Sequence, residues 1–338
     1  MKKILCLLIF VLLFTSLVGC DVENYKVESV EYKTILPQIE STDSYDVIDV
    51  TKDEVFVVHY KQECNLSKTI VESDNKKEEI DSDVCSNYTY KIYSINKNTL
   101  EYREIEHNLD GYYIIQMQSV SDTLYAYEIY KYDYINARFN VYMYYDNLDR
   151  SNKIFETSYF AILDEFVSHM NVIDNTLYFG LFENNDLYLY GLYNNGTISK
   201  KWLANNLKGR MYLSPYIQCE TDTGTEIFSI KNENWYIFNE VITDAAVHLS
   251  DSLCFFVGDN GLYSKDLQSK EKKEYSNEVL AYSDNYIIFS DQIWLMNNGK
   301  YSIKNANFDS TNIKSFVIDE LTVALVYEDR IDIISINK

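Results

Sequence analysis

Residues 175–202 read NTLYFGLFENNDLYLYGLYNNGTISKKW, and this stretch decides the fold. Apolar and aromatic residues follow Asn175, and a second such run extends from Leu187 to Tyr193. The turn Asn194-Asn195-Gly196 then leads into a third run that ends at Trp202. Short aromatic and β-branched runs are typical of strands, and Asn-Gly is typical of a hairpin turn. The stretch therefore predicts strands joined by tight turns.

The same unit recurs along the chain as an apolar strand, a turn with Asp, Asn or Ser, and a second apolar strand. Seven such turns are present, at Asp53, Asp122, Asn175, Ser214, Asp251, Asp284 and Asp319. They are 69, 53, 39, 37, 33 and 35 residues apart. Asp and Asn suit these positions because they bond their own backbone and tolerate left-handed geometry. Four strands in a unit of about 35 to 50 residues are typical of a β-propeller blade.

The composition agrees with an all-β protein. The chain has 32 Tyr, 16 Phe, 10 Gly and 2 Pro, and long apolar patterns at helical spacing are missing. A β-sandwich of this length would need two domains, yet no linker rich in Pro, Gly or Ser divides the chain. A solenoid is the other alternative. We expect a propeller of seven four-stranded blades, with six or eight blades as the alternatives.

The two ends of the chain are expected to close the ring. The last unit stops after Arg330 to Ile336, short of a full blade, while Tyr25 to Thr34 is a strand with no unit of its own. Pairing the two would remove the exposed edges. Residues 25–338 are therefore expected to form one propeller domain. The strand rhythm over about residues 24–338 resembles divergent bacterial propellers of the TolB or quinoprotein-like kind.

The first twenty residues have the anatomy of an export signal. Lys2 and Lys3 precede an apolar run, Ile4 to Phe14, which is too short for the roughly 20 residues that a membrane-spanning helix needs. Leu17-Val18-Gly19-Cys20 follows and resembles the lipobox of bacterial lipoproteins. That resemblance implies a signal peptide over 1–19, a diacylglycerol on Cys20, and a lipidated N-terminus with a short linker over 20–24. We expect a protein anchored by its lipid at the extracytoplasmic face of the cell membrane.

The charge limits the partners of the folded body. Without residues 1–20 the chain has 28 basic and 52 acidic side chains, a net charge of −24. Such a surface repels phosphate backbones and anionic lipid headgroups. We therefore expect no nucleic-acid partner, and membrane contact only through the N-terminal lipid.

Four cysteines remain after Cys6 leaves with the signal and Cys20 is acylated. Cys64 and Cys85 bracket a polar, charged insertion, 65–84, which we expect to be a loop. An exported location permits a disulfide between these two cysteines. Cys219 and Cys254 lie in apolar strands, where buried free thiols are expected.

The sequence assigns no catalytic residue, metal or cofactor. It lacks the nucleophile elbow, phosphate loop and His-Glu-x-x-His patterns. The four histidines, His59, His107, His169 and His248, fall at different positions of their units. We do not expect them to converge on one metal ion.

The best candidate for a binding surface is a tyrosine-rich hairpin in the second unit. Tyr130, Tyr132, Tyr134 and Phe139 lie where the hairpin should project beyond the ring. Exposed tyrosines give a large contact area at low entropic cost. We expect a non-catalytic binding or scaffold module for a protein or a glycan, with the 65–84 segment as a second candidate surface. The alternatives are a carbohydrate-active enzyme, a lyase or glycosidase that uses the central channel, and a sensor subunit of a membrane protein.

Overall fold

A computed structural model describes most of the chain from Ser29 to Asn337. The described residues are 29–36, 44–73, 76–133, 136, 138–159, 170–173, 176–183, 186–205, 212–213, 216–258, 261–275, 278–297, 300–319 and 321–337. They contain strands and turns, and none of them belongs to a helix that is long and apolar enough to cross a membrane.

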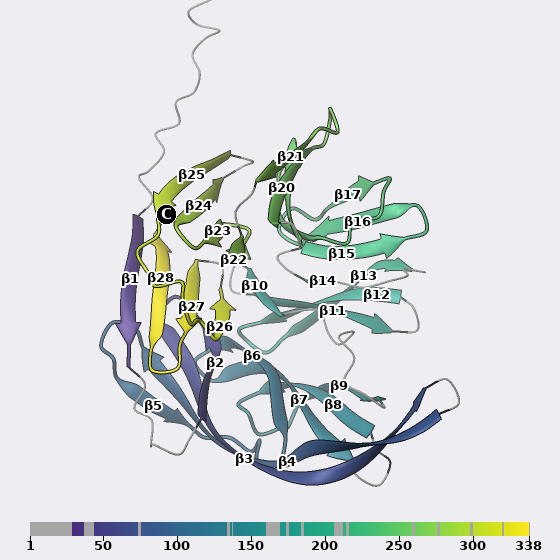
Figure 1. The fold of residues 1–338 in the computed structure, drawn as a ribbon, viewed down its shortest axis with the longest axis vertical. Coiled ribbons are helices and arrows are strands. Elements are labelled where there is room, and N and C mark those ends of the chain that lie inside the picture. The colour runs from purple at the N-terminus through teal and green to yellow at the C-terminus, as the bar shows by residue number, and fades with distance from the viewer. Residues whose placement is uncertain are drawn as a thin grey trace, which may run out of the picture.

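The strands form seven four-stranded antiparallel sheets arranged around a ring (Figure 1). The fold is a seven-bladed β-propeller, as predicted, and each blade is numbered here in chain order. Blades one to three consist of β2 (Ser44–Val50), β3 (Glu54–Ser73), β4 (Lys76–Asn96) and β5 (Tyr102–Ile105); β6 (Tyr113–Ser121), β7 (Leu124–Asp133), β8 (Arg138–Asp146) and β9 (Lys153–Tyr159); and β10 (Asn171–Ile173), β11 (Thr176–Glu183), β12 (Asp186–Tyr193) and β13 (Ile198–Asn205).

Blades four to six repeat the plan with shorter strands. They consist of β14 (Tyr212–Leu213), β15 (Tyr216–Thr221), β16 (Gly224–Ser229) and β17 (Asn234–Phe238); β18 (Ala245–Leu249), β19 (Leu253–Gly258), β20 (Gly261–Asp266) and β21 (Lys272–Tyr275); and β22 (Val279–Ser283), β23 (Tyr286–Phe289), β24 (Gln292–Asn297) and β25 (Lys300–Asn305).

The seventh blade closes the ring with both ends of the chain. It consists of β26 (Ser315–Ile318), β27 (Thr322–Val326), β28 (Ile331–Asn337) and, as its outer strand, β1 (Ser29–Ile35). All seven residues of β1 pair with β28, from Ser29 opposite Asn337 to Ile35 opposite Ile331. This confirms the predicted closure, although residues 25–28 of the predicted strand lie outside the described residues.

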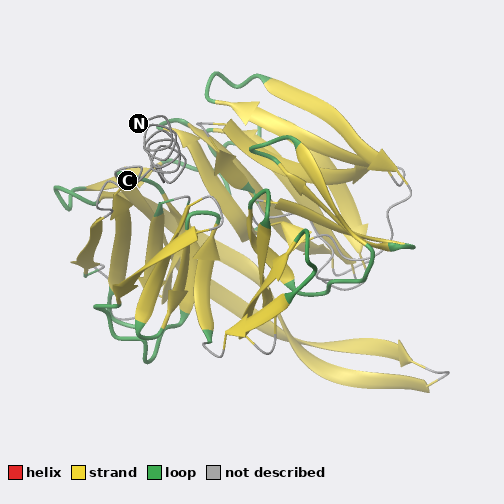
Figure 2. Cartoon of the chain, turned by 90° about the horizontal axis from the view of Figure 1, so that it is seen from above, coloured by secondary structure: helices red, strands yellow, loops and turns green. Residues whose placement is uncertain are grey.

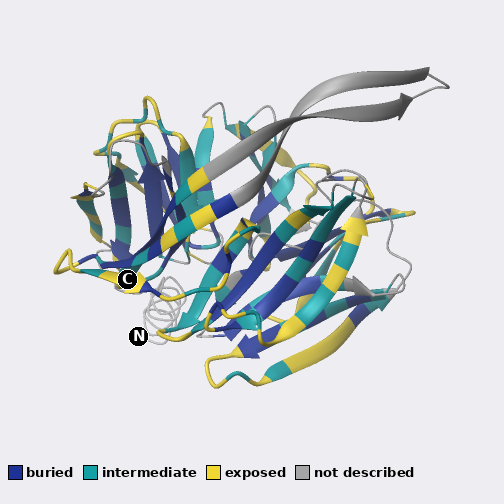
Figure 3. Cartoon of the chain, turned by 90° about the horizontal axis from the view of Figure 1, so that it is seen from below, coloured by how far each residue is buried: buried dark blue, intermediate teal, exposed yellow. Residues whose placement is uncertain are grey.

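The hydrophobic core is divided among the gaps between blades, and the second strand of each blade shows why. In β3, Val55 and Val57 belong to the cluster shared with blade seven, whereas Phe56 and Val58 belong to the cluster shared with blade two. Successive side chains of a strand point to opposite faces, so a strand between two neighbouring blades buries both faces. The continuous apolar runs after the repeated turns follow from this. Figure 3 shows the buried strands inside the blades and more exposed strands at the rim.

The repeated turns that the structure describes, at Asp53, Asp122, Asp251, Asp284 and Asp319, each join the innermost strand of a blade to its second strand. We call the face of the ring with these turns the first-turn face. Because strands alternate in direction, the turns between second and third strands lie on the opposite face. Thr322, next to the turn of blade seven, pairs with Ser335, and β1 begins beside Asn337. The chain therefore enters the ring on the first-turn face.

The longest hairpin belongs to blade one and corrects the prediction of a loop over 65–84. Strands β3 and β4 continue through that segment in one antiparallel ladder, from Glu54 opposite Asn96 to Ser73 opposite Lys76. The inner strand β2 pairs with β3 only as far as Tyr60. We call residues 62–87 the arm; it leaves the ring on the face opposite the first turns, here named the arm face (Figure 2). The polar composition of the segment predicts a loop, but two strands that pair outside the core need no apolar alternation.

Candidate functional site

A cluster of aromatic rings lies at the base of the arm, where blades one and two meet. Its members come from β4, β6, β7 and β8, and all lie near the arm face. We call this the tyrosine cluster: Tyr88, Tyr90, Tyr113, Tyr130, Tyr132 and Phe139.

The rings of the cluster form a continuous chain of contacts. Tyr88 stacks on Tyr90 with centroids 6.2 Å apart and meets Tyr113 edge-on at 5.3 Å. Tyr113 lies 4.9 Å from Tyr130, which meets Phe139 at 5.3 Å. These are distances at which aromatic pairs attract each other beyond simple burial. The cluster therefore holds the two blades together while keeping its rings in fixed positions.

Part of the cluster remains accessible. Tyr113 is 40% exposed, whereas Tyr88 is 5% exposed. Burial raises the pKa of both Tyr113 and Tyr130 above the ordinary tyrosine value. Their hydroxyls therefore stay neutral at physiological pH and can donate hydrogen bonds. The surface combines rigid aromatic rings with neutral polar groups, which suits contact with a protein or a sugar.

The structure brings together three of the four residues predicted for a binding surface. Tyr130, Tyr132 and Phe139 belong to the cluster, while Tyr134 lies outside the described residues. Their role in binding stays a prediction. Sequence reasoning missed Tyr88, Tyr90 and Tyr113, because they come from other strands. The alternation of Tyr88 and Tyr90 was the available signal for these two residues, and no local pattern marked Tyr113.

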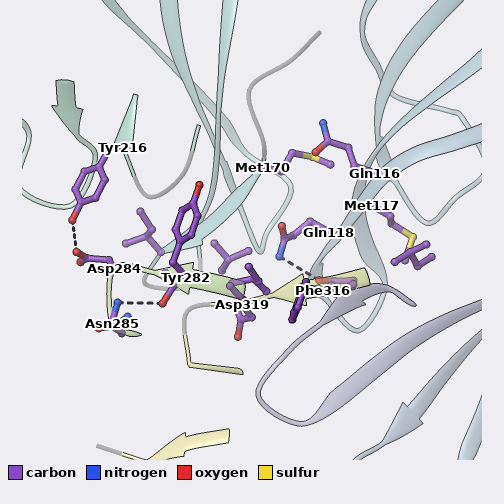
Figure 4. A pocket seen from close by; sticks show the side chains of 18 of the residues that line it. Gln116, Met117, Gln118, Met170, Tyr216, Tyr282, Asp284, Asn285, Phe316 and Asp319 are labelled. Atoms are coloured by element: carbon purple, nitrogen blue, oxygen red, sulfur yellow. Dashed lines mark hydrogen bonds between the residues drawn. The ribbon is translucent and has the colours of Figure 1, made fainter. Parts of the chain in front are cut away.

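A second candidate site is a cavity of about 460 Å³ on the axis of the ring (Figure 4). It is lined mainly by the innermost strands β2, β6, β10, β22 and β26 and by their first turns. Gln116, Gln118, Tyr282, Asp284 and Asp319 contribute polar groups. A wider depression of about 1290 Å³ on the first-turn face adjoins it and shares Asp319.

At one edge of the cavity, Asp284 is held by two buried side chains. His248 Nδ1 lies 2.9 Å from Asp284 Oδ1, and the Tyr216 hydroxyl donates to the same oxygen. The Leu249 amide in turn donates to the Tyr216 hydroxyl at 2.9 Å. Burial alone would raise the pKa of Asp284, but the hydrogen bonds from His248 and Tyr216 outweigh it, so the pKa is lowered. This carboxylate is charged and links blades four, five and six.

At the other edge, Asp49 is almost completely buried between blades one and two. It accepts hydrogen bonds from the Ser119 amide at 2.6 Å and from Gln118 Nε2 at 3.3 Å. Burial, with a smaller contribution from the charge of Asp319, raises the pKa of Asp49 to about 8. Glu128, behind the cavity, accepts from Gln116 Nε2 at 2.7 Å, and burial raises its pKa to about 7.

The histidines that the structure describes lie in separate places. His59 meets Tyr93 edge-on in blade one, and His107 Nε2 lies 3.2 Å from the Tyr90 carbonyl oxygen. His248 lies in blade five, and His169 is outside the described residues. Within the described part of the chain, no three His, Cys, Asp or Glu side chains are grouped so that they could hold a metal ion.

The cysteines divide into two pairs. Cys219 and Cys254 are buried free thiols, as predicted, and burial raises the pKa of each to about 12. Cys64 and Cys85 are directly opposite each other in the β3–β4 register at the base of the arm. A disulfide between them stays a prediction. Cys20 lies outside the described residues.

Comparisons with known proteins concern the fold alone. No protein-family model and no curated protein sequence matches the chain. Among solved structures, the β-propeller domain of the Trilobed protease from Pyrococcus furiosus is 13% identical, with a TM-score of 0.45, and the match covers 88% of this chain and 95% of that one. Hsv2 from Kluyveromyces marxianus is 7% identical, with a TM-score of 0.35, and the match covers 81% and 85% of the two chains.

Proposed function

We propose that this protein is a lipoprotein anchored through Cys20 at the extracytoplasmic face of the cell membrane. Its propeller then serves as a non-catalytic binding or scaffold module for a protein or a glycan, and the tyrosine cluster is the contact surface. The observation that carries the binding role is the chain of ring contacts from Tyr88 to Phe139, with Tyr113 exposed within it. Interfaces are enriched in tyrosine because its ring adds area and its hydroxyl adds a hydrogen bond.

The position of the cluster supports this proposal. It lies at the base of the arm, so a partner that contacts Tyr113 can also contact the arm. The β7–β8 hairpin, in contrast, stays flanked by β6 as far as Tyr130 and by β9 as far as Phe139. Tyr132 and Phe139 are half-buried and fixed by their mutual contact at 4.8 Å. Side chains that are already ordered lose little conformational entropy when a partner binds.

The cavity on the axis supports the alternative of a carbohydrate-active enzyme less well. A glycosidase needs two carboxyl groups free to reach the two sides of a sugar bond. Asp284 is bound by His248 and Tyr216, and Asp49 is bound by Ser119 and Gln118. These bonds and the burial of the two acids explain their shifted pKa values without a reaction. We therefore assign binding to the tyrosine cluster.

Site-specific photocrosslinking in cells tests the proposal. A benzophenone amino acid replaces Tyr132 in the full-length protein, and crosslinked partners are identified by mass spectrometry. We expect a distinct protein adduct, or a glycan adduct sensitive to glycosidases, and at least a tenfold loss of that adduct when Tyr113→Ala is added.

The matched control places the same benzophenone at Tyr193, which is 40% exposed on blade three, far from the arm along the chain. Identical adducts from both positions, or no adduct of either kind from Tyr132, would overturn the proposal. Release of the protein by a Cys20→Ser substitution, read from cell fractions, tests the anchor separately.

A further inference from the structure

Two glutamines of the cavity on the ring axis have their donor groups occupied and present hydrogen-bond acceptors. Gln116 donates its amide nitrogen to Glu128, and Gln118 donates its amide nitrogen to Asp49. Each glutamine therefore directs its carbonyl oxygen away from the acid that it binds. Figure 4 shows Gln116, Gln118 and Tyr282 projecting toward the same space.

The acidic side chains around the cavity also favour a cationic ligand. Asp284 and Asp319 line it, together with Asp49, whose raised pKa leaves it largely neutral at physiological pH, and Lys231 is the basic side chain among the described lining residues. Asp319 lies close enough to Asp49 to influence its ionisation. An acceptor-rich site with an excess of carboxyl groups attracts a cationic donor and repels anions.

The remaining walls are apolar and aromatic. Met170, Leu280, Phe316 and the ring of Tyr282 line the cavity together with the polar groups. A volume of about 460 Å³ lies within the usual range for small-molecule sites and is far larger than a single metal ion. Aromatic rings attract organic cations through their faces, and methylene groups bury well against Met and Leu.

We propose that the axial cavity binds an alkylammonium group, a protonated amine attached to a short methylene chain. The amine faces Asp319 and the glutamine carbonyl oxygens, and the methylene chain lies against Phe316 and Met170. Such a group occurs in free polyamines and in lysine side chains. This site is separate from the tyrosine cluster and does not depend on the proposed binding role of that cluster.

Calorimetric titration of the full-length protein in detergent, at constant ionic strength, tests the site. The probes are 1,5-diaminopentane, a blocked lysine tripeptide, and the neutral pentane-1,5-diol. We expect binding of at least one amine probe and none of the diol, and the tighter amine probe identifies the source of the group. Asp319→Asn should weaken amine binding about tenfold or more.

Asp251→Asn is the matched control, because Asp251 occupies the equivalent turn of blade five, is exposed and does not line the cavity. Gln118→Leu provides a second test in case Asp319→Asn unfolds the protein, which thermal melting reveals. The proposal is wrong if the diol binds as well as the amines, if no amine binds, or if Asp251→Asn weakens binding as much as Asp319→Asn.

Discussion

At the scale of single residues, the acids of this chain differ in role according to burial. Asp251 is an exposed turn residue, whereas Asp284, from the same position of the repeat, binds His248 and Tyr216 across two blade boundaries. The sequence predicts the turn at both positions, because the local geometry is the same. It does not predict the added contacts of Asp284, since these depend on side chains 36 and 68 positions away.

Asp49 gives a prediction about the pH dependence of stability. Its pKa is about 8 in the folded state, against an ordinary value near 4 in the unfolded chain. The folded state therefore holds a proton that the unfolded state releases, and the free energy of unfolding falls as pH rises between these values and levels off above about 8. Asp49→Asn removes this titration, so urea unfolding at pH 5 and pH 8.5 should show a smaller difference than in the wild type.

The control for this measurement is again Asp251→Asn, which changes the same charge at an exposed turn and should keep the full difference. Glu128, with a pKa of about 7, contributes in the same direction, so some pH dependence remains in Asp49→Asn. An unchanged difference between the two pH values in Asp49→Asn would show that Asp49 does not hold the proton.

At the scale of elements, the arm is a pair of strands that the alternating pattern of apolar and polar residues does not predict. The sequence predicts the strands that flank the arm, such as Thr89 to Ile95, because aromatic and β-branched residues alternate there with polar ones. Residues 65–84 lack that alternation, yet β3 and β4 run through them. The pairing continues from the ordered strands at the base, and the local residues do not need to bury a face.

The register of the arm sharpens the prediction of a disulfide. Cys64 and Cys85 are paired in the ladder, next to a register shift at Glu63. Directly opposed residues of an antiparallel pair have Cα atoms about 4.5–5.5 Å apart, within the range that a disulfide spans. We expect the peptides that contain these cysteines to remain joined in a digest of the exported protein until a reductant is added. Separate peptides with free thiols in the unreduced digest would contradict this.

At the scale of the whole molecule, the sequence predicts the ring and its closure but not the sites. Seven turns with the same chemistry predict seven blades. The last blade lacks a fourth strand after Arg330 to Ile336, and this predicts that β1 completes it. The axial cavity joins residues from five innermost strands, so its members are scattered over the whole chain. No local sequence pattern shows that Gln118 and Asp319 line the same cavity.

The ring places the start of β1 and the arm on opposite faces, and this determines how a lipid anchor at Cys20 would orient the protein. β1 enters at the first-turn face, and the arm leaves from the arm face. Nine peptide steps separate Cys20 from Ser29, a reach of at most about 30 Å. The arm extends about 40 Å, since Gln62 to Ser73 is an extended strand. An anchor at Cys20 therefore places the first-turn face toward the membrane and the arm and tyrosine cluster away from it.

Labelling of single introduced cysteines with a bulky maleimide tests this orientation on intact cells without their wall. Asn136→Cys lies in the exposed turn of the β7–β8 hairpin on the arm face, and Lys270→Cys lies in the exposed turn between β20 and β21 on the first-turn face. We expect Asn136→Cys to react equally fast on cells and in detergent, and Lys270→Cys to react at least several times more slowly on cells, because the nearby bilayer restricts a large reagent. The wild-type protein measures background from its own thiols, of which Cys219 and Cys254 are buried. Equal rates for Lys270→Cys in the two conditions, or slower labelling of Asn136→Cys on cells, would show that the first-turn face does not lie against the membrane.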